Sequence, residues 1–272
     1  MTTEYSGAGD PRRSVELLWG AKARPRRGPR PRLTVEEIVR TAIAIADAEG
    51  LDALSMRRIS ESLGIAPMSV YTYVPGKAEL IDLMLDRAFG ELVPSPGGAD
   101  EPGTAPPGPE DEEEWARGWR DRLERIARDY WHLYHRHPWM LQVATGRPPL
   151  GPNVLDEYER ELRAVDGLGL TDLEMDSVVA LVTGFAESAA RVSVNTARVE
   201  QRTGMSDAQW WQAAAPVLEK VVDLSRYPLG NRVGTVAGQV HGGAVGPGHA
   251  FEFGLQRVLD GIEALVQARR TA

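Results

Sequence analysis

The amino-acid sequence predicts an all-α protein, with a small helix-turn-helix head and a larger helical body. Apolar residues recur at spacings of three and four through most of the 272 residues, which is typical of amphipathic helices. No segment shows a convincing strand pattern, and no internal repeat is visible. A stretch rich in Pro, Gly and Ala, from residue 94 to residue 110, has the composition of a linker between the two helical parts.

Composition excludes several classes of protein. Apolar residues make up 42% of the chain, which is enough for a core. The chain has no cysteine, so a disulfide framework and a thiolate zinc site are excluded and a reducing cytoplasm fits. No apolar run approaches the ~20 residues of a membrane span, and the N-terminus lacks the apolar region of a secretory signal. We therefore expect a cytoplasmic protein.

The motifs of common enzymes are also missing. No serine stands in a G-x-S-x-G pattern, no H-E-x-x-H occurs, and the Gly-rich run near the C-terminus lacks the G-K-[ST] ending of a P-loop. The acids at 110–114 form a charge run, which is usually a solvated linker. We expect no enzymatic activity and no cofactor.

Charge is distributed unevenly along the chain. The net charge of −8 argues against nucleic-acid binding over the whole surface, and residues 100–114 hold seven acids without a base. A basic front end combined with an acidic body is typical of a protein that places only one end on DNA. The bases without an acid among them are Lys22, Arg24, Arg26, Arg27, Arg30 and Arg32.

These shifts in composition divide the chain into four parts. Residues 1–32 form a basic arm, which we expect to be mostly disordered except that the short apolar turn Ser14–Gly20 packs back on the body. Residues 33–92 form the head and residues 93–112 a linker rich in Pro, Gly and acids. Residues 113–272 form the helical body.

The head begins with a capped helix. Thr34 is a predicted N-cap for a helix that runs to about Glu49, where Gly50 ends it. A later helix, from Lys77 to about Leu92, should place its leucines inside and Asp82, Asp86 and Arg87 largely outside. The expected buried stripe of the first helix consists of Val35, Ile38, Val39, Ala42, Ile43 and Ala46.

Between these two helices lies the most informative stretch, Leu54–Lys77. Ser55 is a predicted N-cap, Gly64 supplies the positive φ at the end of that helix, and Pro67 suits the first turn of the next one. The second helix carries hydroxyls, aromatic rings and a methyl group instead of charges on its wet face, which suits a major groove and its phosphates. The residues of that face are Met68, Ser69, Tyr71, Thr72 and Tyr73.

The body is predicted to be helical throughout, with breaks at proline and glycine. The Gly-rich stretch Pro228–Gly248 is expected to be a flexible connection. The expected helices are Glu113–Arg136, Trp139–Thr145, Val154–Val165, Asp172–Val194, Asp207–Leu224 and His249–Arg269.

Over roughly residues 33–90 the chain resembles the head of the tetracycline-repressor (TetR) family. The marks are the helix ending in AEG, the step into LSMRRIS, the LGI turn and the exit Y-x-Y-V-x-x-K-x-x-L, all in the right order. In the body, the RHPW turn and the ATGRPP break look like the tetracycline-repressor subgroup, whereas residues 1–32 lie outside the likeness.

The resemblance implies a homodimeric repressor whose heads fit successive major grooves of a palindromic operator and whose body binds a small effector. It implies dimerisation through the helices at about 172–194 and 249–269. An intramolecular core is the alternative for their apolar stripes. These stripes are Val178, Val179, Val182, Ala186, Ala189 and Ala190 on one helix and Phe251, Leu255, Val258, Leu259, Ile262 and Leu265 on the other.

The resemblance also assigns contacts with DNA. It implies that Arg57 contacts a base or a phosphate, that Tyr71 contacts DNA and that Tyr73 contacts a phosphate. Lys77 opens the next helix near the DNA backbone, so we expect it to contact a phosphate as well. The alternatives are solvated arginines, core aromatic rings and, for the basic arm, a solubilising tail. The predicted DNA-binding set is Ser55, Arg57, Arg58, Pro67, Met68, Ser69, Tyr71, Thr72, Tyr73 and Lys77, with Arg24, Arg26 and Arg27 of the arm on phosphates or in a minor groove.

The chain departs from the subgroup where tetracycline and magnesium bind. Ala88 and Phe89 stand where that subgroup has a histidine, and Gln142, Val143 and Ala144 surround the position of its metal-bound histidine. We therefore expect a different, largely apolar effector without a metal. The predicted effector-binding residues are Phe89, Trp119, Trp131, Tyr134, Trp139, Met140, Val143 and Phe185.

Two further alternatives concern the body. His132, His135 and His137 have no matched carboxylate at a suitable spacing, and a histidine near a helix C-terminus is favoured by the helix dipole, so a metal site is not expected there. An architectural DNA-binding protein without an effector would also fit the head. The size of the body, residues 113–272, argues against it.

Overall fold

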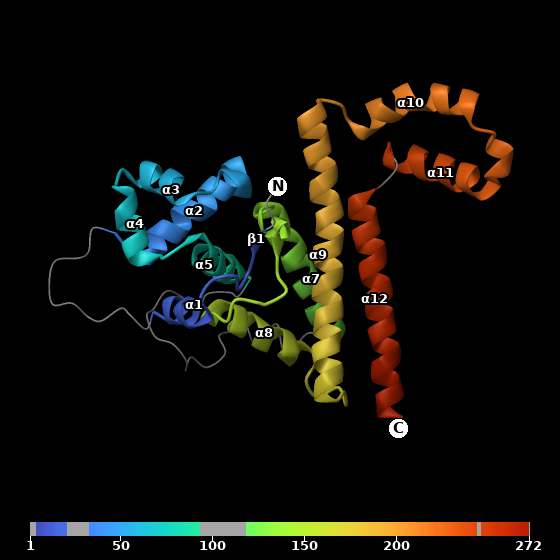
Figure 1. The fold of residues 1–272 in the computed structure, drawn as a ribbon. Helices are drawn as coiled ribbons and strands as arrows, with labels where there is room; N and C mark the ends of the chain where they lie inside the picture. Colours follow the sequence, from blue (N-terminus) through green and yellow to red (C-terminus); the bar gives the residue numbers. More distant parts are fainter. Residues whose placement is uncertain (1–3, 21–32, 93–117, 244–245, 272) are drawn as a thin grey trace.

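The computed structural model describes residues 4–20, 33–92, 118–243 and 246–271, and most of these residues lie in helices (Figure 1). This confirms the all-α prediction with a helix-turn-helix head. The head contains α2 (Val35–Glu49), a 3₁₀ turn (Leu51–Ala53), α3 (Met56–Leu63) and α4 (Pro67–Tyr73). Helix α5 (Lys77–Phe89) leads from the head into the body, and its apolar residues belong to one continuous core that both parts share.

The start of α2 follows its local sequence. The Thr34 hydroxyl accepts a hydrogen bond from the Glu37 amide at 3.1 Å, and the Glu37 carboxylate accepts one from the Thr34 amide at 2.8 Å. This reciprocal capping box satisfies two of the amides that a helix start leaves unpaired. Gly50 ends the helix with a φ of 86°, as expected. Of the predicted stripe, Val35 and Ile43 are half-buried and the others are buried.

Helix α5 corrects the sequence-based interpretation of its polar residues. Asp82 and Asp86, which were expected outside, are only 1% and 5% exposed, and Glu79 is buried as well. Asp82 accepts hydrogen bonds from the Gly7 amide at 2.9 Å and the Ser14 hydroxyl at 2.8 Å. Asp86 accepts from the Val154 amide at 3.1 Å, and its burial raises its pKa. Periodicity alone could not show these donors, because they come from outside the head.

The N-terminal segment is a second correction. Residues 4–13 are not disordered, and the expected packing of Ser14–Gly20 on the body is confirmed. Residues 4–20 form the strand β1 (Glu4–Tyr5), parallel to β2 (Val143–Ala144), and the helix α1 (Pro11–Leu18), which packs on α5. The Trp19 indole donates to the Leu150 carbonyl at 2.9 Å. The backbone pairing and the buried carboxylates of α5 hold this polar segment. The basic residues 22–32 and the linker 93–112 lie outside the described residues.

The body is built on α7 (Trp119–Arg136), α8 (Pro152–Val165), α9 (Asp172–Thr203) and α12 (Pro247–Arg270). Helices α9 and α12 run side by side, and α7 packs against both (Figure 1). The predicted helix Trp139–Thr145 is instead a 3₁₀ turn (Met140–Gln142) followed by β2. Prolines before and after this stretch leave too few residues for a stable α-helix.

A helical arm extends from the ends of α9 and α12. It consists of α10 (Asp207–Val221), a 3₁₀ turn (Leu224–Arg226) and α11 (Pro228–His241) (Figure 1). The Gly-rich stretch, expected to be a flexible connection, is therefore largely helix α11. Proline at its first position favours a helix start, and the glycines that lower its helix propensity, Gly230, Gly234 and Gly238, line the space between α10 and α11.

Helix α9 meets the length and hydropathy criteria of a membrane span, which the sequence analysis did not expect. It has 32 residues and a window with a mean hydropathy of 1.3. A core helix meets the same criteria, and α9 packs against both α7 and α12.

Candidate nucleic-acid interface and effector site

The turn between α3 and α4 is built by local signals. The Ser55 hydroxyl accepts from the Arg58 amide at 3.1 Å and so caps α3. Gly64 ends α3 with a φ of 65°, and the Ile65 amide then donates to the Ser60 carbonyl at 3.0 Å. This closure, which a residue with a side chain adopts only at a cost, sets the angle between the two helices.

Helix α4 presents the face that the sequence predicted. Val70 is fully buried and Tyr73 packs half-buried against the core, so the opposite side of α4 points away from the head. Met68 is 74% exposed, and Tyr71 is exposed beside it. Thr72 is exposed too, and its hydroxyl donates to the Met68 carbonyl at 3.1 Å. Pro67 and Ser69 complete the first turn of the helix.

The two arginines of α3 have different surroundings. The Arg57 side chain is 83% exposed, and its Nε lies 2.8 Å from the Glu61 carboxylate in the same helix. The Arg58 guanidinium reaches the Glu49 carboxylate at 2.6 Å, which lowers the pKa of Glu49 and ties α3 to the end of α2. Arg57 thus keeps most of its surface exposed despite its pair with Glu61, whereas Arg58 connects two helices of the head.

Lys77 stands at the first position of α5, and three residues separate it from the end of α4. Its ammonium lies 2.9 Å from the Glu4 carboxylate of β1. The lysine predicted to bind a phosphate is therefore paired, within the chain, with an acid from the segment that was expected to be disordered. Three further predicted DNA contacts come from the basic N-terminal segment and lie outside the described residues: Arg24, Arg26 and Arg27.

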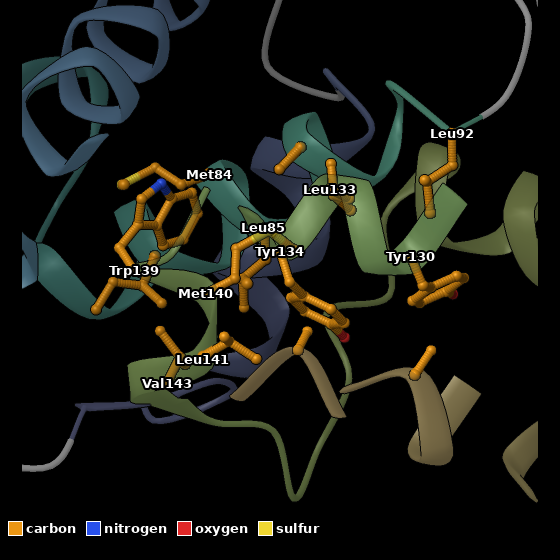
Figure 2. Packing of buried hydrophobic residues seen from close by; sticks show 14 of the residues in the cluster. Met84, Leu85, Leu92, Tyr130, Leu133, Tyr134, Trp139, Met140, Leu141 and Val143 are labelled. Atoms are coloured by element: carbon orange, nitrogen blue, oxygen red, sulfur yellow. The ribbon is translucent and has the colours of Figure 1, made fainter. Parts of the chain in front are cut away.

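The eight predicted effector residues do not form one cluster. Phe89 and Tyr134 both approach Tyr130, with ring centroids 6.0 Å apart in each case. Trp131 and Phe185 stack on Phe251 of α12 instead, at 4.3 and 5.9 Å. Trp119 is half-buried at the start of α7, while Trp139, Met140 and Val143 are buried in the segment after α7 (Figure 2).

Trp139 belongs to the contact between head and body. Figure 2 shows it beside Met84 of α5, and its indole donates to the Asp47 carboxylate of α2 at 2.9 Å. The same carboxylate lies 2.8 Å from His137 Nδ1, and His137 Nε2 lies 3.3 Å from Glu91. His137 is thus held between two carboxylates. Asp47 gave no signal in the sequence, because it sits among exposed residues of an amphipathic helix.

A buried polar pair in the body was also missed. The Tyr130 hydroxyl donates to the Glu161 carboxylate of α8 at 2.7 Å, and Glu161 is only 4% exposed. Burial raises the pKa of Glu161 to about 7 and raises that of Tyr130 well above its usual value. Glu157, one turn earlier, is buried too. Carboxylates four residues apart in a charged helix look like a solvated face, so the sequence alone could not identify them.

Two notable cavities lie among the described residues. One has a volume of about 330 Å³ and lies among charged residues of α7 and α8, including Arg125, Asp129 and Arg160. The other has a volume of about 730 Å³ and lies between α10 and α11, lined by residues such as Trp211 and Tyr227. Among the described residues, neither lining includes a predicted effector residue.

The apolar stripes of α9 and α12, which were expected to form the dimer interface, are buried within the single chain. Val178, Val182 and Ala186 of α9 are buried, as are Phe251 and Leu255 of α12, within a single protomer. These stripes therefore form an intramolecular core, which was the alternative interpretation. Other large apolar residues of the same helices and of the arm are exposed: Leu181, Val192, Val199 and Phe253, with Trp210, Val217, Val221, Leu229, Val233, Val236 and Val240.

Comparison with known proteins gives two family matches. Residues 33–84 match the model described as bacterial regulatory proteins, tetR family, and residues 109–266 match the tetracyclin repressor-like C-terminal domain. An HTH-type transcriptional repressor, DrrR1 of Streptomyces coeruleorubidus, is 45% identical over 270 residues, which cover 99% of this chain and 92% of that protein.

Solved structures agree with these matches. The apo structure of ActR from Streptomyces coelicolor has a TM-score of 0.63 and 27% identity, covering 88% of this chain and 99% of that one. The structure of ActR in complex with actinorhodin has a TM-score of 0.62 and the same 27% identity, covering 87% and 99%.

Proposed function

The chain belongs to the tetR family of bacterial regulatory proteins, and from this premise we propose that it is a transcriptional repressor released by a small effector. The family consists of DNA-binding regulators rather than enzymes. We further propose that a homodimer binds a palindromic operator and that the effector is largely apolar. Residues 33–92 would be the DNA-binding domain and residues 113–272 the domain for effector binding and dimerisation.

The exposed face of α4 carries the DNA-binding proposal. Val70 anchors the helix in the core, while Met68 and Tyr71 point away from it and Arg57 extends from α3. An arginine can pair bidentately with guanine O6 and N7, and a hydroxyl can bind a phosphate oxygen. We assign Arg57 and α4 to base edges and Ser55, Tyr73 and Lys77 to phosphates.

The exposed apolar faces of α9, α12 and the arm support the homodimer. Every residue of α10 and α11 is exposed or half-buried in the single chain. Contiguous exposed apolar surface of this kind marks an interaction site. On α11 the exposed residues 229, 233, 236 and 240 follow helical spacing, so they form one stripe. We propose that a second copy of the chain covers this stripe together with the outer faces of α9 and α12.

The effector proposal rests on similarity to a relative of known structure. The solved relative ActR, similar over most of its length, was crystallised with actinorhodin and with (S)-DNPA. By this similarity we propose that a small organic molecule binds in the body of this chain as well. Phe89 and Tyr134 would supply apolar contacts, and the buried Tyr130–Glu161 pair would supply the polar group that orients the ligand.

Selection of DNA from a random pool tests the repressor proposal. We expect a two-fold symmetric site whose half-sites are about one helical turn apart, on the order of 34–36 Å. A pool that converges only on asymmetric single half-sites would contradict dimeric binding. If the protein had no affinity for duplex DNA, the proposal as a whole would be contradicted.

A thermal-shift screen distinguishes the repressor from an architectural DNA-binding protein. A ligand that binds only the folded state raises the midpoint by mass action. We expect largely apolar small molecules to raise it without magnesium, and a purely architectural protein would respond to none of them. Tight binding of tetracycline that depends on magnesium would overturn the assignment of the effector.

A further inference from the structure

The ion pair between Lys77 and Glu4 joins two regions with different tasks. Lys77 begins α5 next to the reading helix, and by the proposed function it binds a DNA phosphate. Glu4 belongs to β1, which pairs with β2 of the body. The Lys77 Nζ and the Glu4 Oε1 are 2.9 Å apart, and the side chains of Lys77 and Glu4 are only 30% and 28% exposed. A carboxylate fixed by the body thus occupies the place where the head would receive a phosphate.

The position of Glu4 is set by backbone contacts. Glu4 and Tyr5 pair in register with Val143 and Ala144. The Ser6 amide donates to the Ala144 carbonyl at 3.1 Å, and its hydroxyl donates to the Arg147 carbonyl at 2.5 Å. The next residue is tied to the head, because the Gly7 amide donates to Asp82 of α5 at 2.9 Å. Glu4 is therefore held beside Lys77 and is not a loose end that drifts against it.

We propose that Glu4 is a built-in competitor of the DNA phosphate at Lys77. An ammonium paired with a carboxylate at this distance must give up or share that partner when it binds a phosphate. Releasing the pair costs free energy, so the contact is weaker than a free lysine would make. This inference rests on the proposed function, since it needs Lys77 to contact DNA.

The location of the competitor links it to the body. β2 directly follows the 3₁₀ turn Met140–Gln142, and Val143 itself is buried in the core. A displacement of β2 moves β1 with it, and so changes how closely Glu4 approaches Lys77. The free energy of the ion pair is then part of the coupling between the body and DNA binding.

The test is a double-mutant cycle of Glu4→Gln and Lys77→Gln. The probe is a fluorescently labelled duplex of random sequence at low salt, so that no operator is needed. Glu4→Gln should tighten binding by about 2- to 30-fold for a dimer, because a partly exposed ion pair contributes up to about fivefold per protomer. In the Lys77→Gln background the same change should leave the affinity unaltered.

Asp52→Asn is the matched control. It removes one negative charge from an exposed position of the head, so any general relief of repulsion appears equally in both backgrounds. Ser6→Ala offers a second variant. It loosens β1 without changing a charge and should give part of the gain, again only when Lys77 is present. Thermal midpoints of all variants show that the fold is kept.

Three results would overturn the inference. Weaker binding by Glu4→Gln would mean that Glu4 positions Lys77 for DNA, and equal tightening in both backgrounds would mean general repulsion. An unchanged affinity for Glu4→Gln would likewise contradict competition. If the unaltered protein binds no duplex at all, the proposed function itself fails, and that result is separate from these.

Discussion

Helix α4 and the arm of α10 and α11 are both largely exposed, yet they expose opposite chemistry. Helix α4 has one fully buried anchor, Val70, and shows hydroxyls, a thioether and a phenol to the outside. The arm has no anchor of this kind, and its α11 stripe consists of aliphatic side chains. The first surface can form hydrogen bonds with another molecule, whereas the second can only be covered.

The difference shows that exposure alone does not identify a partner. A surface with donors, acceptors and an arginine gains from base edges and phosphates, which offer the matching groups. A surface of valine and leucine gains only when water is removed from it, and this happens against another apolar surface. One chain thus carries one surface suited to DNA and one suited to protein.

The largest expected effect concerns the arm. Leu229→Glu with Val236→Glu places two charges in the α11 stripe, where the single chain leaves these residues 66% and 58% exposed. We expect the dimer dissociation constant to rise at least ~100-fold, because substitutions at central interface residues cost about 2 kcal/mol or more each. Sedimentation velocity measures the change, while the protomer should keep its fold.

Arg232→Glu is the control for the arm. It lies on α11, is exposed, and changes the net charge by the same two units as the double variant. Dimerisation should survive it. If the double variant and the control dimerise alike, the α11 stripe is not an interface, and the assignment of this surface to a protein partner is wrong.

The second effect lies between the two surfaces, in the body core. The pKa of Glu161 is raised to about 7, so the folded protein holds this proton more tightly than the unfolded chain does. The stability of the protein should therefore fall as the pH rises from about 5 through 7. The glutamine of Glu161→Gln does not ionise. Between pH 5 and pH 8 the variant's free energy of unfolding should therefore rise by about 3 kcal/mol relative to that of the parent protein.

Urea unfolding at the two pH values measures this gain. Glu159→Gln is the matched control, since it lies on the same helix but its side chain is 60% exposed beside Arg163. An equal response of both variants would rule out burial as the cause. DNA binding and dimerisation should be unchanged in both, which separates the core from the two surfaces.

The third effect is confined to the DNA surface. Arg57→Ala should weaken operator binding by about 1–3 kcal/mol and relax the base preference at one position. Arg58→Ala should keep that preference, because the less exposed Arg58 guanidinium bridges α3 to Glu49 of α2 within the head. Selection with each variant reads out the preference. Relaxation by Arg58→Ala and none by Arg57→Ala would reverse the two roles.

The smallest effect concerns the basic segment. Arg26→Gln should lower the slope of log K against log salt by about 0.9 for each phosphate that the side chain no longer neutralises, one in each protomer. A point substitution is the better test, because a deletion of residues 1–31 would also remove β1 and α1. An unchanged slope would mean that Arg26 does not touch DNA.

Local sequence signals predicted the helices and their ends well, but they could not predict contacts between residues far apart in the sequence. Thr34, Gly50 and Gly64 act within one turn of their own helix, so sequence alone placed them correctly. The burial of Asp82 depends on donors from Gly7 and Ser14, about 70 residues away. No periodicity encodes such a partner. The same holds for Glu161 and Asp47, and it explains why the exposed face of α4 was predicted more fully than the core of the body.

The buried carboxylates of α5 also limit modularity. Glu79, Asp82 and Asp86 lie at the boundary that an engineer would cut to graft this DNA reader onto a foreign sensor. Their donors come from Asp10, Gly7, Ser14, Asn153 and Val154, all outside the head. A chimera of residues 33–92 would carry three acids into an interface without those donors. A working graft has to bring the N-terminal segment along and supply an amide at the start of the helix that replaces α8.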